Sequence, residues 1–318
     1  MTEAAADAAS PGDPTVLRAS PQRLVRGWSF APSSPSLATR LRRMRLTRRA
    51  PAPRSRTVRA PEPADRWNCL FLFAPDGLLD ADQRRILDRV RALAGRLLVV
   101  VATPAPDRLP EAVETADAVI WKDLPGFDFS GYALALEAVA RFSPGATAYV
   151  QNDSVLGPFG DLDALVEAAR WDLTGFMGSR AVENHISSFA FVLKDVTPRR
   201  LEMLAPALST AWCYDDFAPV VMLQETRLAR VAARGMTVGS FWYLPCAPHE
   251  PLLGGMLARR LGIGSARARR DARGDATLSF PLILLDRGFP FLKRSLFTKF
   301  AGLEPPERLR ARLAQLGW

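Results

Sequence analysis

The stretch TAYVQNDSVLGPF, residues 147–159, decides the fold class. Its apolar start, 146–150, predicts a buried strand, which Asn152, Asp153 and Ser154 end abruptly. A buried parallel strand that ends in an acid places a carboxylate at the carboxyl edge of the sheet, where open α/β sheets bind ligands. Asp153 is therefore the first functional candidate. The alternative is an Asx-type turn that merely closes the strand.

Apolar runs alternate with amphipathic helices on both sides of this stretch. The run 69–73 predicts a buried strand, and Asp80 with Gln83 predicts a capping box at the start of the helix that follows it. Continuous apolar strands separated by helices are typical of a mainly parallel α/β sheet flanked by helices. Further strands are expected at 97–102, 118–121, 172–176, 188–193 and 237–243, and further helices at 132–142 and 220–234.

Composition divides the chain into three parts. Residues 66–250 carry the α/β pattern, whereas residues 1–65 are rich in Pro, Ser and Ala without periodicity and predict a disordered arm. Residues 251–318 predict a basic, helical C-terminal extension. The arm holds a basic cluster, which is either a solvated tail or a segment attracted to an anionic membrane face or polyanionic partner. Its arginines are Arg40, Arg42, Arg43, Arg45, Arg48, Arg49, Arg54, Arg56 and Arg59.

Length, charge and cysteine usage exclude several classes of protein. The 318 residues are 48% hydrophobic and carry a net charge of +9, yet no run reaches the ~18 apolar residues of a membrane span. The N-terminus does not resemble a secretory signal. Cys69, Cys213 and Cys246 lack metal spacing and predict reduced thiols in a cytoplasmic protein. No basic motif interleaved with aromatic residues is evident, so no nucleic-acid partner is expected.

Two further acids are functional candidates. Glu225 shares a predicted helix face with Val221 and Leu228, and a carboxylate on an apolar face is costly to bury unless it is paired, protonated or functional. It is alternatively a first-turn acid favoured by the helix dipole. Asp128 follows Gly126 in an expected loop between a strand and a helix, where it either meets a ligand or caps the helix.

Other polar residues have weaker signals. His185 precedes an apolar strand and is either a structural hydrogen-bonding residue or a ligand. Asp215 and Asp216 suit a metal or an acceptor hydroxyl, although helix capping is the favoured interpretation.

Six segments, in their order and spacing, resemble the rhamnan synthesis protein F family of glycosyltransferases. They are also similar, more distantly, to family 2 glycosyltransferases of the GT-A fold. The resemblance extends over residues 67–300. The segments are GFDFSGY (126–132), YVQNDSVLGPF (149–159), DLTGF (172–176), HISSFAFVLK (185–194), QETRLARVAARGM (224–236) and DRGFPFLKRSLF (286–297).

The resemblance implies a GT-A-like fold and a role for each candidate. Gly126 and Asp128 fall where such enzymes contact the nucleotide, and Asn152 with Asp153 falls on their acidic metal-binding motif. Glu225 corresponds to their late acid, a catalytic base. His185 lies in a segment that implies an acceptor or metal contact. The strand-end motif here has one acid rather than two, which leaves metal dependence open.

The implied reaction is inverting transfer of a sugar from a nucleotide-diphosphate donor. The acceptor would be a cell-surface polysaccharide or its lipid carrier at the inner membrane face, and the family name suggests rhamnose as the sugar. Mg²⁺ or Mn²⁺ would neutralise the diphosphate, and Lys293 and Arg294 would add charge there unless they lie on a solvated helix. The competing hypothesis is a non-catalytic polysaccharide-assembly or polyanion-binding protein with a degenerate site.

Overall fold

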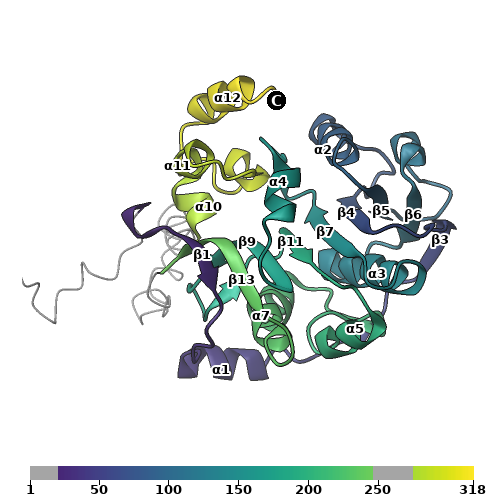
Figure 1. The fold of residues 1–318 in the computed structure, drawn as a ribbon, viewed down its shortest axis with the longest axis horizontal. Helices are drawn as coiled ribbons and strands as arrows, with labels where there is room; N and C mark the ends of the chain where they lie inside the picture. The colour runs from purple at the N-terminus through teal and green to yellow at the C-terminus, as the bar shows by residue number, and fades with distance from the viewer. Residues whose placement is uncertain (1–20, 246–274) are drawn as a thin grey trace, which may run out of the picture.

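A large twisted sheet organises the chain in the computed structural model, which describes residues 21–245 and 275–318 (Figure 1). In spatial order its strands are β1 (Val25–Ser29), β13 (Val238–Leu244), β9 (Leu173–Ser179), β11 (Ala190–Leu193), β7 (Thr147–Asn152), β4 (Arg66–Phe73), β5 (Arg96–Ala102), β6 (Ala118–Lys122) and β3 (Ser55–Arg59). The short strand β10 (His185–Ile186) pairs with β9 away from this path.

The centre of the sheet is mainly parallel. Strands β7, β4, β5 and β6 run in one direction. Strand β11 is antiparallel to both β7 and β9, so β9 and its parallel neighbour β13 share the direction of β7. The expected α/β architecture, a mainly parallel sheet flanked by helices, is therefore confirmed, and it is consistent with the expected GT-A-like fold.

Helices cover both faces of the sheet, and Figure 1 shows α2 and α3 on opposite sides of strands β4 to β6. One apolar core lies under α3, α5 and α7, and a second lies under α2, α4 and α11. The helical elements are η2 (Pro21–Arg23), α1 (Leu37–Met44), α2 (Ala81–Arg91), η3 (Glu111–Thr115), α3 (Phe127–Phe142), α4 (Leu162–Glu167), α5 (Pro198–Leu204), α6 (Phe217–Pro219), η4 (Val220–Glu225), α7 (Thr226–Ala232), α10 (Ala276–Ser279), α11 (Pro281–Asp286), η5 (Arg294–Phe297) and α12 (Pro306–Gln315).

Strand register aligns the carboxyl ends of the parallel strands at one edge. Asn152 at the end of β7 pairs with Phe71 of β4, while Phe73 pairs with Ala102 at the end of β5. Asp153 follows directly after β7, at this edge. The predicted capping box is present, because the Asp80 side chain accepts from the Gln83 N–H and Gln83 Oε1 accepts from the Asp80 N–H.

The predicted disordered arm is wrong from residue 21 onward. Strand β1 pairs with β13 and strand β3 pairs with β6, so this segment closes both edges of the sheet. Another short strand, β2 (Ala50–Pro51), pairs with β12 (Trp212–Cys213). Several arginines of the basic cluster have internal partners: Arg54 pairs with Asp123, and Arg49 stacks on Trp212. Residues 1–20 of the predicted arm lie outside the described residues.

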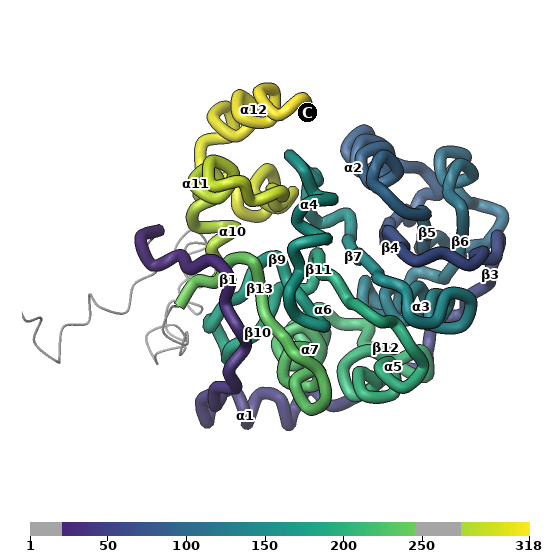
Figure 2. Tube along the Cα trace, viewed as in Figure 1, coloured from purple at the N-terminus to yellow at the C-terminus, as the bar shows by residue number. Residues whose placement is uncertain are grey.

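The C-terminal extension is helical where it is described, from residue 275, and its arginine-rich part 251–274 lies outside the described residues. Figure 2 shows α10, α11 and α12 at one end of the molecule and α1 at the opposite end. Strand β14 (Leu292–Lys293) joins the extension to the sheet domain by pairing with β8 (Val155–Leu156). Because β8 follows Asp153, this pairing brings the extension to the carboxyl edge.

Candidate functional site

A large cleft opens at the carboxyl edge of the sheet. Its volume is about 2240 Å³. Asp128, Asp153 and Glu225, which are far apart in the sequence, all line it. Asn152 and His185 line it as well. The structure therefore brings the sequence candidates Asp128, Asn152, Asp153, His185 and Glu225 together around one hollow, while Gly126 lies between two residues that also line it.

Asp153 is held by two hydrogen-bond donors, one from strand β4 and one from helix α2. Its Oδ2 accepts from the Phe73 N–H at 2.9 Å and from Gln83 Nε2 at 2.6 Å. Gln83 is the capping-box residue of α2, so the helix start also positions the acid. Burial raises the pKa of Asp153, and the two hydrogen bonds oppose that rise. The carboxylate is thus fixed in place, with Oδ1 making no hydrogen bond among the described residues.

Asp128 lies in the first turn of α3, not in the loop expected from the sequence. The helix begins at Phe127, because Gly126 adopts φ +92° and turns the chain directly into it. Only glycine suits this position, since a Cβ there would approach Ser130 Oγ to 2.7 Å. Phe127 itself has φ +49°, a conformation that costs L-residues about 1–2 kcal/mol.

Three donors orient the Asp128 carboxylate. Oδ2 accepts from Asn152 Nδ2 at 2.7 Å and from the Tyr132 hydroxyl at 3.2 Å, while Oδ1 accepts from the Phe129 N–H at 3.0 Å. Burial and the negative charge of Glu225 nevertheless raise the pKa of Asp128 to about 6. Asp128 and Glu225 therefore interact electrostatically, although they come from the separate elements α3 and η4.

Glu225 ends a π-helical segment, η4, inside the helix expected at 220–234. Single π-helical turns widen a helix locally and are frequent at functional sites. Here the turn leaves Glu225 at the cleft, where its Oε1 accepts from the Ser188 N–H at 3.1 Å. Compared with Asp128, Glu225 is lightly constrained, and its second carboxylate oxygen makes no hydrogen bond within the described part of the chain.

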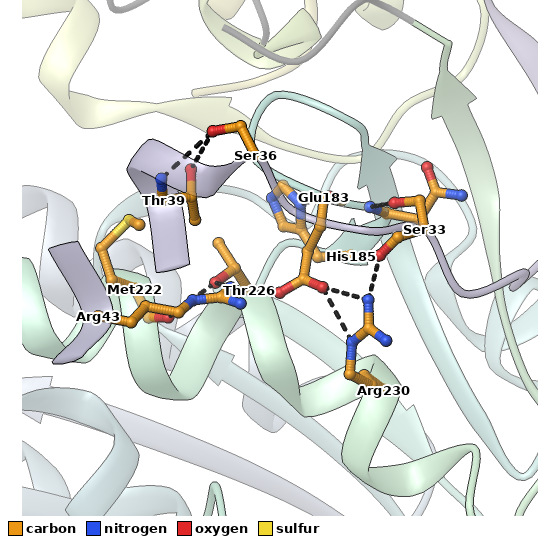
Figure 3. Close-up of polar contacts among 10 residues, drawn as sticks. Ser33, Ser36, Thr39, Arg43, Glu183, His185, Met222, Thr226 and Arg230 are labelled. Carbon is orange, nitrogen blue, oxygen red and sulfur yellow. Dashed lines mark hydrogen bonds and ion pairs between the residues drawn. The ribbon is translucent and has the colours of Figure 1, made fainter. Parts of the chain in front are cut away.

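His185 lines the cleft and is also joined to a buried polar network (Figure 3). Its Nδ1 lies 2.7 Å from the carbonyl oxygen of Glu183. The Glu183 side chain is fully buried and forms ion pairs with Arg43 of α1 and Arg230 of α7. Arg43 Nε also donates to the Met222 carbonyl at 2.8 Å. This network fixes α1 against the helix that carries Glu225.

Lys293 lies on strand β14 and Arg294 begins the short helix η5, and both side chains are half-buried, whereas one interpretation of the sequence placed them on a solvated helix. The Arg294 N–H donates to the Ser154 carbonyl at 3.0 Å, and its guanidinium forms an ion pair with Asp80 at 2.5 Å. Lys293 Nζ lies 4.3 Å from the centre of the Phe189 ring. Both cations line the cleft beside Asp153, so they supply positive charge at its carboxylate-rich rim.

Asp215 and Lys122 hold the turn before α3. Asp215 does not cap α6, which was the favoured interpretation, but accepts from the Gly126 N–H at 3.0 Å; Asp216 precedes α6 without a side-chain cap. Lys122 is buried, and its Nζ donates to the carbonyls of Asp123 and Pro125 at 2.8 Å each. Burial lowers the pKa of Lys122 to about 8. Nothing local in the sequence signals either role.

The cleft also exposes aromatic surface. Phe73, Phe127 and Phe217, the exposed phenylalanines in the ranges 21–245 and 275–318, all line it. Large exposed apolar groups gathered in one hollow are typical of ligand-binding sites. The cleft therefore combines carboxylates, cations and aromatic faces.

Comparisons with known proteins add little to this geometry. No family model matches the sequence, and no curated protein matches it. Among solved structures, the chain is similar to the crystal structure of HddC from Yersinia pseudotuberculosis, at 11% identity and a TM-score of 0.34. That similarity covers 56% of this chain and 92% of the other. A likeness this weak does not bear on function.

The side chains fit a divalent cation only in part. No three His, Cys, Asp or Glu side chains in the described ranges are grouped to hold a metal. Asp153 and His185, the expected ligands, therefore belong to no such group of three in the described ranges. Mg²⁺ often takes one carboxylate and completes its shell with water and substrate phosphates. Asp153, through Oδ1, fits that role.

Proposed function

We propose that the chain is a glycosyltransferase that moves a sugar from a nucleotide-diphosphate donor to a hydroxyl acceptor. One observation carries the proposal. Asp128, Asp153 and Glu225 share one cleft at the carboxyl edge of an α/β sheet, and each carboxylate is held by a different set of hydrogen-bond donors. Carboxylates with different surroundings can take different roles in one reaction.

The donor would bind along the wall formed by β4, β7 and the C-terminal extension. Exposed Phe73 and Phe127 offer apolar faces for a nucleoside base. Asp128 and Asn152 present a fixed carboxylate and amide to sugar hydroxyls. Lys293 and Arg294 would bind the diphosphate, because cations stabilise the charge that develops on a departing phosphate.

A divalent cation, when held by Asp153 and the donor phosphates, would neutralise further leaving-group charge. Side chains of the protein itself would orient the donor and accept the proton of the acceptor hydroxyl. Asp153 keeps its orientation through Phe73 and Gln83, so it is preorganised without the donor.

Glu225 is the proposed general base. Its carboxylate is held by one backbone donor, and it remains partly exposed at the cleft. As the acceptor oxygen attacks the anomeric carbon, Glu225 would take the hydroxyl proton while the nucleoside diphosphate leaves from the opposite face. Such an in-line displacement inverts the anomeric configuration. We propose rhamnose as the transferred sugar, on the resemblance to the rhamnan synthesis protein F family.

The test is a binding screen of the full chain by thermal shift and calorimetry. Nucleoside diphosphates and nucleotide sugars would be offered with and without Mn²⁺ or Mg²⁺. A ligand at 100 times its Kd stabilises the native state by about 2.7 kcal/mol, which a melting experiment resolves. The proposal expects at least one nucleotide to bind, with binding weakened by Asp153→Asn and unchanged by Asp107→Asn, an exposed acid outside the cleft. It is abandoned if none binds.

A further inference from the structure

Helix α1 exposes an apolar stripe that nothing in the described structure covers. Leu37, Leu41 and Met44 are 72%, 51% and 72% exposed. At 3.6 residues per turn, these three side chains fall within roughly 60° of one another around the helix axis. Large apolar groups gathered on one helix face mark an interaction surface.

The other two faces of α1 are turned toward the rest of the protein. Arg43 points inward to Glu183 and Thr226, and Ser36 caps the first turn through the Thr39 N–H (Figure 3). Arg42 and Arg45 line the cleft. The outward stripe is therefore a third face, held in a fixed orientation by the inward one.

The segment of sequence that carries the stripe has charge of one sign. Between Asp13 and Glu62 the sequence has no acidic residue, whereas the helix and the turn after it hold six arginines. Arg40, Arg42 and Arg45 are exposed beside the stripe. An amphipathic helix with an apolar face bordered by arginines is suited to the interface of a bilayer that contains anionic lipids.

We propose that α1 docks the protein on an anionic phospholipid surface, with Leu37, Leu41 and Met44 inserted among the lipids. A protein partner fits less well, because three side chains offer far less than the ~800 Å² that each partner of a stable complex buries. Since the same helix lines the cleft, docking would place the cleft beside the lipid surface, where a lipid-linked acceptor would be found. The docking itself is independent of the proposed reaction.

Vesicle flotation with the full chain tests the proposal and needs no nucleotide sugar. The probes are vesicles of phosphatidylcholine alone and of phosphatidylcholine with phosphatidylglycerol. The wild type is expected to float with the anionic vesicles and to be released as salt is raised, because screening weakens surface attraction. Leu37→Ser/Leu41→Ser/Met44→Ser is expected to lower binding at least about tenfold.

Val58→Ser is the matched control, because Val58 is also 50% exposed but lies on β3 outside the cleft. It is expected to bind like the wild type. Equal flotation of the triple variant and the wild type would overturn the proposal. The proposal would also be overturned if neither protein floats and the wild type is a dimer that the triple substitution converts to a monomer. That result would assign the stripe to a second copy of the chain. Melting curves of each variant confirm that it is folded.

Discussion

Replacing Asp128 with Asn removes a carboxyl whose ionisation the fold opposes. Burial and the nearby Glu225 raise the pKa of Asp128 from 3.8 to about 6, against the three hydrogen bonds that lower it. Between about pH 4 and 6 the unfolded carboxyl has lost its proton while the folded one keeps it. The folded state then binds more protons, so the free energy of unfolding falls as pH rises through this window and stays lower above it.

The size of the effect follows from the pKa. A difference of about two pH units corresponds to about 3 kcal/mol at ~1.4 kcal/mol per unit. Because the carboxyl keeps some contact with solvent, screening reduces this to about 1–3 kcal/mol. Asn cannot ionise, so the stability of Asp128→Asn relative to wild type should rise by that amount between pH 4 and 7. Asp80 and Asp172, whose pKa values are lowered, contribute equally to both proteins and cancel.

Urea unfolding of both proteins at several pH values measures this difference. Asp107→Asn, at an exposed position outside the cleft, should run parallel to wild type. In a Glu225→Gln background the gain from Asp128→Asn should shrink, because one cause of the raised pKa is gone. Parallel pH profiles for Asp128→Asn and wild type would refute the electrostatic description of the cleft.

Three further changes test other parts of the account. Arg43→Met leaves the buried Glu183 half-paired and should lower the free energy of unfolding by about 3 kcal/mol, measured by urea titration, with partial recovery in the Glu183→Gln double variant. Gly131→Ala places a Cβ against the Phe71 ring and should lower the melting temperature, at a cost of about 1–3 kcal/mol. Arg294→Gln should weaken nucleoside diphosphate binding about tenfold by calorimetry, because it removes one of the cations beside Asp153.

Each change has a control in the same chain. Arg42→Met alters an exposed arginine of the same helix and should leave stability within about 0.5 kcal/mol. Gly302→Ala adds a Cβ where no atom lies within 4 Å and should be tolerated. Arg310→Gln removes an exposed arginine of α12 and should not alter nucleotide affinity. A control that behaves like its test variant would contradict the corresponding interpretation.

The centre of the fold follows from local signals in the sequence. Continuous apolar runs produced β4, β5, β6 and β7, because strands buried on both faces need no polar alternation. The Asp80–Gln83 capping box formed as expected. The position of Asp153 at a strand end was also predictable, because the apolar run and the polar residues that end it are adjacent in the sequence.

The edges of the sheet and parts of the site depend on contacts distant in sequence. Strand β3 is exposed at every residue, so no hydrophobic periodicity reveals it, and its order comes from pairing with β6. Arg43 forms an ion pair with Glu183, which is 140 residues away in the sequence. Asp215 meets the Gly126 N–H in the same way, and Arg294 reaches Ser154 through the β14–β8 pairing. A single sequence carries no signal for such pairs.

Turnover of a nucleotide sugar by wild type and Glu225→Gln tests the central claim most directly. The donor identified by the binding screen would be supplied with an acceptor, and released nucleoside diphosphate would be measured. The account predicts that Glu225→Gln binds the donor within a few-fold of wild type while its rate falls by about 10²–10⁴. Glu137→Gln, an exposed acid on α3 outside the cleft, should react at the wild-type rate. Full activity in Glu225→Gln would contradict the account, as would a wild type that neither binds nor cleaves any nucleotide sugar.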